Sequence, residues 1–216
     1  MWHIDQLGQA TFLDSTATPL ASVSARGRQA GVHLGVHAGS QATSLAVTDV
    51  TGEPLPAVGD SYVRGNDFIA RLAQGENDAF GLTLQATLVE TEARSTVLEC
   101  VAEMQTRLLD SHPEIEFAVA AESIETLAPG SELVTCEGQY LSVLRTPRDQ
   151  AASRTLPPDS GIYRLRIFGD FLEKGVIRKA RPWIVIDSAT EAGAEHDREL
   201  RRCWEALRRT PLPLMA

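Results

Sequence analysis

The sequence predicts an α+β fold in which antiparallel β-sheet dominates, arranged as one or two packed sheets, with an amphipathic helix at the carboxyl end. Apolar and polar residues alternate with a period of two in many short runs, which is typical of strands that bury one face. Segments rich in Gly, Pro, Asn and Asp separate these runs, and a helical period replaces the alternation only near residue 200. We expect one domain over residues 1–216, because a chain of this length can bury a sizeable core; it would subdivide at the loop expected over 146–160.

The first quarter of the chain predicts a hairpin. The segment 31–37 alternates strictly, with three aliphatic residues on one face and two histidines and a glycine on the other. Residues 43–50 repeat the alternation and predict the second strand. A loop is expected over 51–60, because this segment holds two Gly and two Pro residues.

The middle of the chain predicts three more strands. Residues 62–73 are expected to form one strand broken near Gly65, and residues 80–90 the next. Residues 96–109 fit both a helical stripe and a strand alternation. We favour a strand, because residues 91–95 have the length of a hairpin connection.

Shorter elements are expected between residues 114 and 187. Residues 114–120 and 140–145 predict strands, with a short helix near 123–127 between them. Residues 163–167 and 176–187 predict the last two strands.

A helix starting at Asp170 competes with part of this interpretation, because Asp170 and Glu173 have the spacing of a capping box. Gly175 and Pro182 both weaken that helix. We therefore expect a turn that closes at Gly175, followed by a strand in which Pro182 marks an edge or a bulge.

Residues 195–209 predict the amphipathic helix. Its apolar stripe has the spacing i, i+3, i+4, i+7 and consists of Leu200, Cys203, Trp204 and Leu207. Glu205 lies four residues before Arg209, and basic residues suit a helix end. We expect Trp204 to pack against the sheet, so that truncation to alanine costs about 3–5 kcal/mol.

The composition predicts no cofactor and no metal. Cys100, Cys136 and Cys203 are odd in number, far apart and without a Cys-x-x-Cys pair, so we expect reduced thiols and no structural zinc. His33 and His37 lie about 13 Å apart if they occupy one strand, too far to share an ion unaided. Neither a phosphate loop nor a dinucleotide fingerprint occurs in the sequence.

The first fifteen residues contain two Asp, no Lys or Arg, and no apolar run of secretory length. The longest weakly polar stretch, residues 80–89, is half as long as a membrane span requires. We therefore expect a bacterial-type cytoplasmic protein that does not bind a membrane.

The net charge of −9 is the sum of two unlike parts. Residues 1–144 carry 19 acidic and 6 basic residues, or −13, whereas residues 145–216 carry 10 acidic and 14 basic residues, or +4. Opposite signs favour contact between the two parts, within one chain or between copies in a homo-oligomer, over binding to a polyanion.

The segment 164–181 is the candidate interaction surface, because it interleaves basic and aromatic residues. Its members are Arg164, Arg166, Phe168, Lys174, Arg178, Lys179 and Arg181. Modules that bind single-stranded nucleic acid use this mixture, since phosphates need cations and bases stack on aromatic rings. The net negative charge opposes a polyanion, so we expect this segment to dock on the acidic part of the chain or on an acidic partner.

Catalytic residues cannot be named from the sequence. Residues 110–113 combine Asp, Ser and His, but a turn closed by Pro113 accounts for them. Two carboxylate pairs lie on single strand faces and could in principle divide acid and base roles, although solvated acidic faces account for them as well. These pairs are Glu99 with Glu103, and Glu114 with Glu116.

The sequence thus favours a non-enzymatic interaction or scaffold domain that binds a protein partner or a second copy. The alternative is a hydrolytic enzyme with carboxylates in a cleft between sheet and loops. The third hypothesis is a module for single-stranded nucleic acid that uses residues 164–181. A deep pocket lined by carboxylates or histidines would favour the enzyme, whereas an exposed apolar or charged patch would favour the interaction module.

Overall fold

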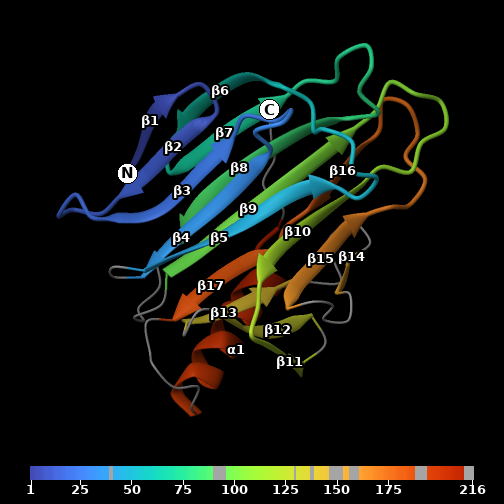
Figure 1. Ribbon diagram of the computed structural model, residues 1–216. Coiled ribbons are helices and arrows are strands. Elements are labelled where there is room, and N and C mark those ends of the chain that lie inside the picture. The colour runs from blue at the N-terminus through green and yellow to red at the C-terminus, as the bar shows by residue number, and fades with distance from the viewer. Residues whose placement is uncertain are drawn as a thin grey trace.

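Two antiparallel β-sheets pack face to face in the computed structural model of the protein (Figure 1). The structure describes residues 1–38, 41–89, 96–128, 130–136, 139–145, 153–155, 161–187 and 194–211. Within these residues one helix, near the carboxyl end, accompanies the sheets. The α+β class that the alternation predicts is therefore confirmed. Within the described residues, no helix is both long and apolar enough to cross a membrane.

The first sheet has eight strands in the order β1-β2-β3-β4-β5-β10-β15-β14. Its strands are β1 (Trp2–Gln6), β2 (Gln9–Leu13), β3 (Pro19–Ala25), β4 (Val32–Ala38), β5 (Gln41–Asp49), β10 (Glu114–Ala120), β15 (Ile162–Phe168) and β14 (Ser153–Thr155). The predicted hairpin over 31–50 corresponds to β4 and β5, and the predicted strands over 114–120 and 163–167 correspond to β10 and β15.

The second sheet has nine strands, eight of them in the order β11-β12-β13-β17-β9-β8-β7-β6, with β16 also paired to β9. Its strands are β6 (Val58–Arg64), β7 (Asp67–Leu72), β8 (Gly81–Val89), β9 (Thr96–Gln105), β11 (Ser123–Ala128), β12 (Ser131–Cys136), β13 (Gln139–Leu144), β16 (Ile177–Ala180) and β17 (Trp183–Asp187). The ambiguous segment 96–109 is a strand over most of its length.

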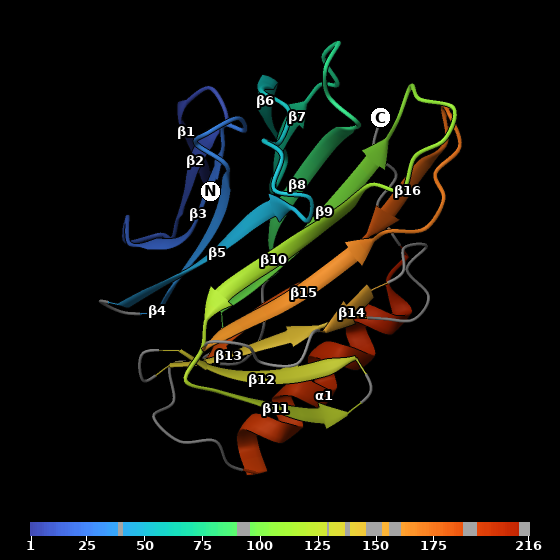
Figure 2. The same ribbon diagram turned by 45° about the vertical axis from the view of Figure 1, so that its right-hand side comes forward.

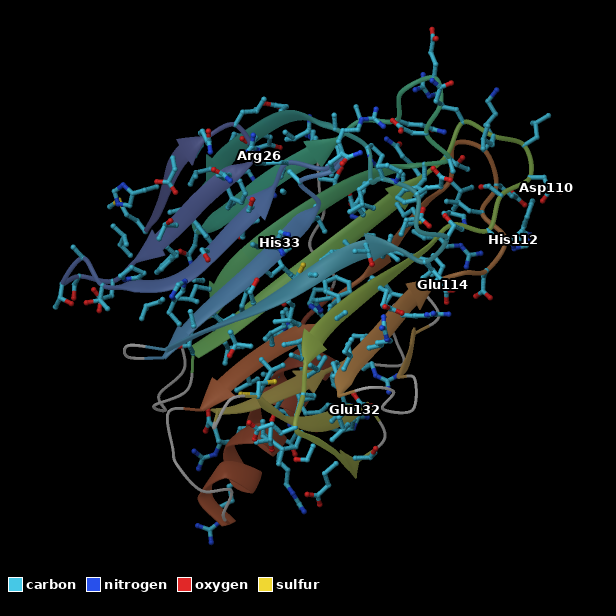
Figure 3. The ribbon with its side chains drawn as sticks, in the orientation of Figure 1. Arg26, His33, Asp110, His112, Glu114 and Glu132 are labelled. Carbon is cyan, nitrogen blue, oxygen red and sulfur yellow. The ribbon has the colours of Figure 1, made fainter. Side chains whose placement is uncertain are left out.

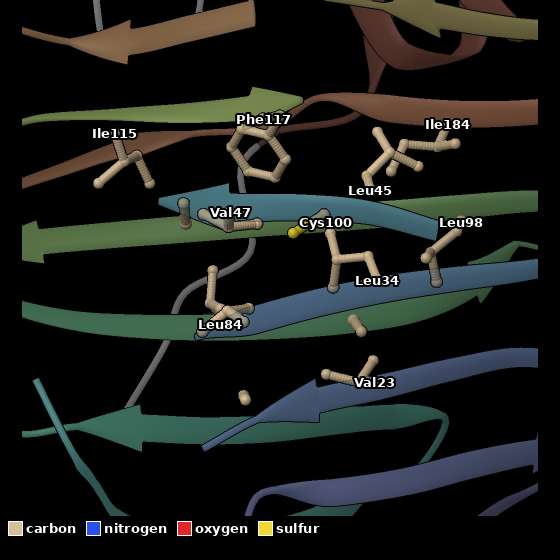
Figure 4. Packing of buried hydrophobic residues seen from close by; sticks show 14 of the residues in the cluster. Val23, Leu34, Leu45, Val47, Leu84, Leu98, Cys100, Ile115, Phe117 and Ile184 are labelled. Carbon is tan, nitrogen blue, oxygen red and sulfur yellow. The ribbon is translucent and has the colours of Figure 1, made fainter. Parts of the chain in front are cut away.

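The main core lies between the two sheets (Figure 4). Strand β9 shows how the alternation builds it: Leu98, Cys100 and Met104 face the other sheet and are fully buried. The intervening residues, such as Glu99 and Glu103, lie on the outer face of the nine-stranded sheet. Strands β3 and β4 supply opposing aliphatic side chains in the same way.

The helix α1 (Ala194–Arg209) covers part of the outer face of the nine-stranded sheet (Figure 2). A second core joins them, and it consists of Val97, Leu144, Trp183, Val185, Leu200, Cys203 and Leu207. The predicted helix over 195–209 is confirmed. Trp204 packs against this core but is only partly buried, and the Arg208 guanidinium lies 4.5 Å from its ring centroid. We call this region the helix end.

Several sequence-based expectations were wrong. The strand expected over 62–73 does break at Gly65, which adopts a φ of +60° in a turn, but the two parts are separate strands, β6 and β7, that pair as a hairpin. The expected helix near 123–127 is strand β11, paired with β12. The three amino-terminal strands β1 to β3 were not expected at all.

The strand expected over 176–187, with an edge or a bulge at Pro182, is divided into two strands. The chain forms β16 and β17 on either side of Arg181 and Pro182, and both strands pair with β9. The turn expected to close at Gly175 is also present, since Val176 N donates to Glu173 O at 3.0 Å. The competing helix from Asp170 does not form. Of the loop expected over 146–160, only residues 153–155 lie within the described chain, where they form β14.

Candidate functional site

Two members of the candidate interaction surface, Arg164 and Arg166, are bound by acidic residues of the same sheet. Both flank Glu116, which lies on β10 next to β15 and is 4 % exposed. Arg166 Nε donates to Glu116 Oε2 at 2.8 Å, and Arg164 Nη1 donates to Glu116 Oε1. Glu114 also lies 4.0 Å from Arg166. These arginines therefore serve an intramolecular ion-pair cluster.

The other sheet binds further members of the set. Lys179 Nζ lies 2.5 Å from Glu103 Oε1, opposite it in the pairing of β16 with β9. Arg178 lies 3.7 Å from Asp170, and Lys174 is exposed in the turn before β16. Arg164, Arg166 and Phe168 thus lie in the eight-stranded sheet, and Arg178 and Lys179 lie in the nine-stranded sheet. The acidic partners Glu103 and Glu116 come from the negatively charged first 144 residues.

Arg181 lies in the break between β16 and β17, where it has a structural role. It is 2 % exposed, and its guanidinium donates to the carbonyl oxygens of Leu207 at 2.8 Å and of Thr210 at 2.7 Å. A further bond of 3.0 Å reaches Pro211 O. These carbonyls lie at and just beyond the carboxyl end of α1, where orphan acceptors and the negative end of the helix dipole favour a cation. Arg181 therefore fixes the helix to the sheet.

Glu99 completes this buried network. Its Oε2 accepts a hydrogen bond of 2.6 Å from Trp183 Nε1 and lies 3.7 Å from Arg181. Burial raises the pKa of Glu99 above its usual range, although the Trp183 bond and the Arg181 charge oppose this. Because the carboxyl is held between a strand and the helix end, we assign it to packing.

Phe168 is buried at the end of β15 with a φ of +71°, and Gly169 follows with a φ of +90°. A left-handed conformation is rare for a bulky residue. Gly169 N donates to Pro113 O at 2.9 Å, so this kink redirects the chain from β15 into the loop beside residues 106–113. Phe168 is thus a core residue that turns the chain.

The two loops that meet there gather exposed apolar side chains at one end of the sandwich. Gly175 N donates to Thr106 O at 3.0 Å and Leu172 N to Ser111 O at 2.9 Å, which fixes the loops side by side (Figures 1 and 2). Nine large apolar residues of the described chain are exposed, and five lie here. They are Leu108, Leu109, Phe171, Val176 and Ile177, and we call them the loop-end patch. The remaining four do not adjoin these loops in sequence.

A cleft of about 510 Å³ opens beside the loop-end patch. His112 connects the two, because it lines the cleft and its ring centroid lies 5.7 Å from that of Phe171. Figure 3 shows Asp110, His112 and Glu114 following one another along this end of the molecule. The apolar walls of the cleft include Pro54, Pro56, Phe80 and Pro113, and its charged lining consists of Arg28, Asp49, Glu53, Asp78 and Glu114.

Arg28 and Asp78 form a bidentate pair in this lining. The Nη1 to Oδ1 distance is 2.6 Å and the Nη2 to Oδ2 distance is 3.1 Å. Burial would raise the pKa of Asp78, but the Arg28 bonds, a bond from Gly75 N and the Arg28 charge together lower it. Arg28 reaches this position through a tight turn in which Gly27 is required, since a Cβ there would lie 1.8 Å from Pro56 O. The Arg28 guanidinium is therefore bound by the Asp78 carboxylate.

The cleft offers little for acid and base catalysis. Asp78 is held as an anion by Arg28, and Asp49 Oδ1 accepts from Thr51 N at 2.7 Å within its own turn. Glu99, the carboxyl whose pKa burial raises, lies at the helix end instead. The carboxylate pairs proposed from the sequence are thus bound in ion pairs or in packing.

The histidines and cysteines do not assemble into a metal site within the described residues. His37 Nε2 lies 3.2 Å from Ser22 Oγ on the outer face of the eight-stranded sheet, and burial lowers the pKa of His37. All three cysteines are buried, and burial raises the pKa of Cys100 and of Cys203 to about 12.

Comparison with models of known protein families and with curated proteins finds no match to this chain. The loop-end patch and its cleft were also not anticipated from the sequence. Their one signal was the pair Leu108 and Leu109, two apolar residues in succession just before a polar turn.

Proposed function

We propose that this protein is a non-enzymatic interaction module that binds another protein through the loop-end patch. One observation carries the proposal: five large apolar side chains, between 40 % and 80 % exposed, lie in and beside two adjoining loops. Soluble proteins rarely leave apolar residues clustered at the surface unless they bind something there. The loops are fixed to each other by backbone bonds, which lowers the entropic cost of binding.

The charges around the patch suit a protein partner better than a polyanion. The flanking loops carry Asp110, Asp170 and Glu173 as well as Arg107, Lys174 and Arg178, so that neither sign dominates. The basic residues of β15 and β16 that could have tracked phosphates are bound to Glu116 and Glu103. Nucleic acid therefore stays the least favoured of the three hypotheses.

Site-specific cross-linking tests the proposal. Leu109, 80 % exposed, is replaced by p-benzoylphenylalanine, and the protein is illuminated in the cells that produce it. Leu7, 54 % exposed in the turn between β1 and β2, is the matched control position. We expect a discrete product at position 109 that is absent at position 7.

The captured protein is then purified, and its affinity is measured by calorimetry. Leu109→Glu should weaken binding at least tenfold, because it places a charge in a desolvated contact, whereas Leu7→Glu should leave binding unchanged. A product that contains two copies of this chain would identify self-association, to be measured by sedimentation. Absence of any product at position 109, or equal weakening by both variants, would refute the proposal.

A further inference from the structure

We infer that the partner presents a cationic side chain, Lys or Arg, which enters the cleft while neighbouring apolar residues cover the loop-end patch. This inference rests on the proposed function and adds the chemistry of the partner. It is carried by the cleft, whose charge, walls and position differ from those of the patch beside it.

The charge of the cleft is the first argument. Its lining holds four carboxylates and one guanidinium, besides His112. Arg28 neutralises Asp78, and Arg166 lies near Glu114. Asp49 and Glu53 have no cationic partner among the residues that the structure describes. A cleft with low-dielectric walls focuses such charge, so the cleft attracts a cation.

The walls of the cleft are the second argument. A lysine or arginine has a long aliphatic stem and a charged head, and it buries the stem against apolar surface while the head reaches polar groups. Pro54, Pro56 and Pro113, together with Phe80, supply that surface. A small inorganic cation would make no use of these walls.

The position of the cleft indicates which kind of ligand bears the cationic group. His112 belongs to the cleft and packs against Phe171 of the patch, so one bound segment can reach both. The patch takes apolar side chains and the cleft takes the basic one. The structure therefore points to a polypeptide segment in which a basic residue is flanked by apolar residues.

Three fluorescein-labelled peptides of twelve residues test this inference by fluorescence anisotropy. They share one pattern of leucines and carry Lys, Gln or Glu at the remaining positions. At low ionic strength the Lys peptide should bind at least tenfold more tightly than the Gln peptide, and the Glu peptide more weakly still. The preference should shrink at about 0.5 M salt, where charges are screened beyond a few ångströms.

Paired variants separate the cleft from the overall charge. Asp49→Asn with Glu53→Gln removes two cleft charges, and asparagine can keep the acceptor that Thr51 N requires. Glu122→Gln with Glu125→Gln removes two exposed charges in and beside β11, at the other end of the molecule (Figure 2). The cleft variant should lower the preference for the Lys peptide at least fivefold, and the β11 variant should leave it unchanged.

Each result decides the inference. Equal binding of the Lys and Gln peptides, both weakened by Leu109→Glu, would overturn the cationic partner and leave the interaction module standing. If both paired variants lost the preference for the Lys peptide equally, that preference would arise from the net charge of the protein, and the inference would be overturned as well. Failure of all three peptides to bind would also overturn it, and cross-linking at position 109 would then decide the proposed function separately.

Discussion

The helix end and the loop end of this protein differ in whether their apolar side chains are covered. At the helix end, Val97 and Trp183 on the outer face of a sheet are covered by Leu207 and its neighbours on α1. At the loop end, Leu109 and Phe171 remain exposed, and no described element of the chain covers them. The same residue types thus stabilise the fold at one end and are available to a partner at the other.

The difference also extends to charge. Arg181 at the helix end is fully buried and donates to the carbonyls at the end of α1, whereas Arg28 at the loop end is half exposed beside an open cleft. The sequence alone does not distinguish the roles of Arg181 and Arg28, because both lie in loops or strand breaks. Their surroundings in the fold do distinguish them. Mutations at the helix end should therefore affect stability, whereas mutations at the loop end should affect binding.

Arg181→Met should have the largest effect on stability. It leaves three carbonyls without their donor and Glu99 without its buried counter-charge, and breaking such a pair typically costs about 3–5 kcal/mol. Lys179→Met is the control, since its ion pair with Glu103 is near the surface and should contribute about 0–1 kcal/mol. Denaturant unfolding of both variants measures the contrast. Similar losses would contradict the role of Arg181 at the helix terminus.

Leu207→Ala and Leu109→Ala compare one residue type at the two ends. Leu207 is fully buried, so its truncation should cost about 2–5 kcal/mol. Leu109 is 80 % exposed, and its truncation should change the free energy of unfolding by less than about 0.5 kcal/mol. Thermal and denaturant melts give both values. A cost above about 1.5 kcal/mol at Leu109 would mean that the loop-end patch serves folding.

Trp204→Ala should have an intermediate effect. The sequence predicted about 3–5 kcal/mol for a buried tryptophan, but the side chain is only partly buried and lies under Arg208. We now expect about 1–3 kcal/mol, in proportion to the smaller apolar area removed from water. Chemical denaturation measures it, with Leu207→Ala as the reference for full burial. A larger loss for Trp204→Ala than for Leu207→Ala would place Trp204 at the centre of the helix-end core.

The smallest effect is a pH dependence at the cleft. The pKa of Asp78 is lowered in the folded protein, so the ionised carboxylate stabilises the fold above its unfolded pKa of about 3.9. That stability is lost as pH falls through the lowered value. Asp78→Asn should therefore be less stable than the wild type at pH 7, and the difference should vanish in acid. Asp60→Asn, on the exposed edge strand β6, serves as control; a difference for Asp78→Asn that persists in acid would exclude the ion pair as its cause.

The sequence predicted those parts of the fold that depend on local periodicity. Leu98, Cys100 and Met104 alternate clearly, so β9 could be recognised despite a competing helical stripe. Strands β2 and β3 were missed because their buried positions include Ala10, Ala21 and Ala25, whose small side chains give a weak alternation. The short strand β11 was mistaken for a helix because its alternation of apolar and polar residues is also weak.

The candidate site depended on contacts that one sequence does not contain. Arg164 and Arg166 were correctly placed on one face of a strand, but their partner Glu116 lies about fifty positions earlier and reaches them only through the register of β10 with β15. The loop-end patch joins residues near 108 with residues near 176. Their exposure follows from the kink at Phe168 and from backbone bonds between loops, which periodicity does not encode.

The most direct test of the contrast is a methyl NMR titration with the protein captured at position 109. Leucine, valine and isoleucine methyls report both ends of the molecule in one spectrum. We predict that methyl signals of Leu108, Leu109 and Ile177 shift on binding, whereas those of Leu144 and Leu207 at the helix end do not. Shifts confined to the helix end, with the loop-end methyls unchanged, would contradict the assignment of the loop-end patch as the binding surface.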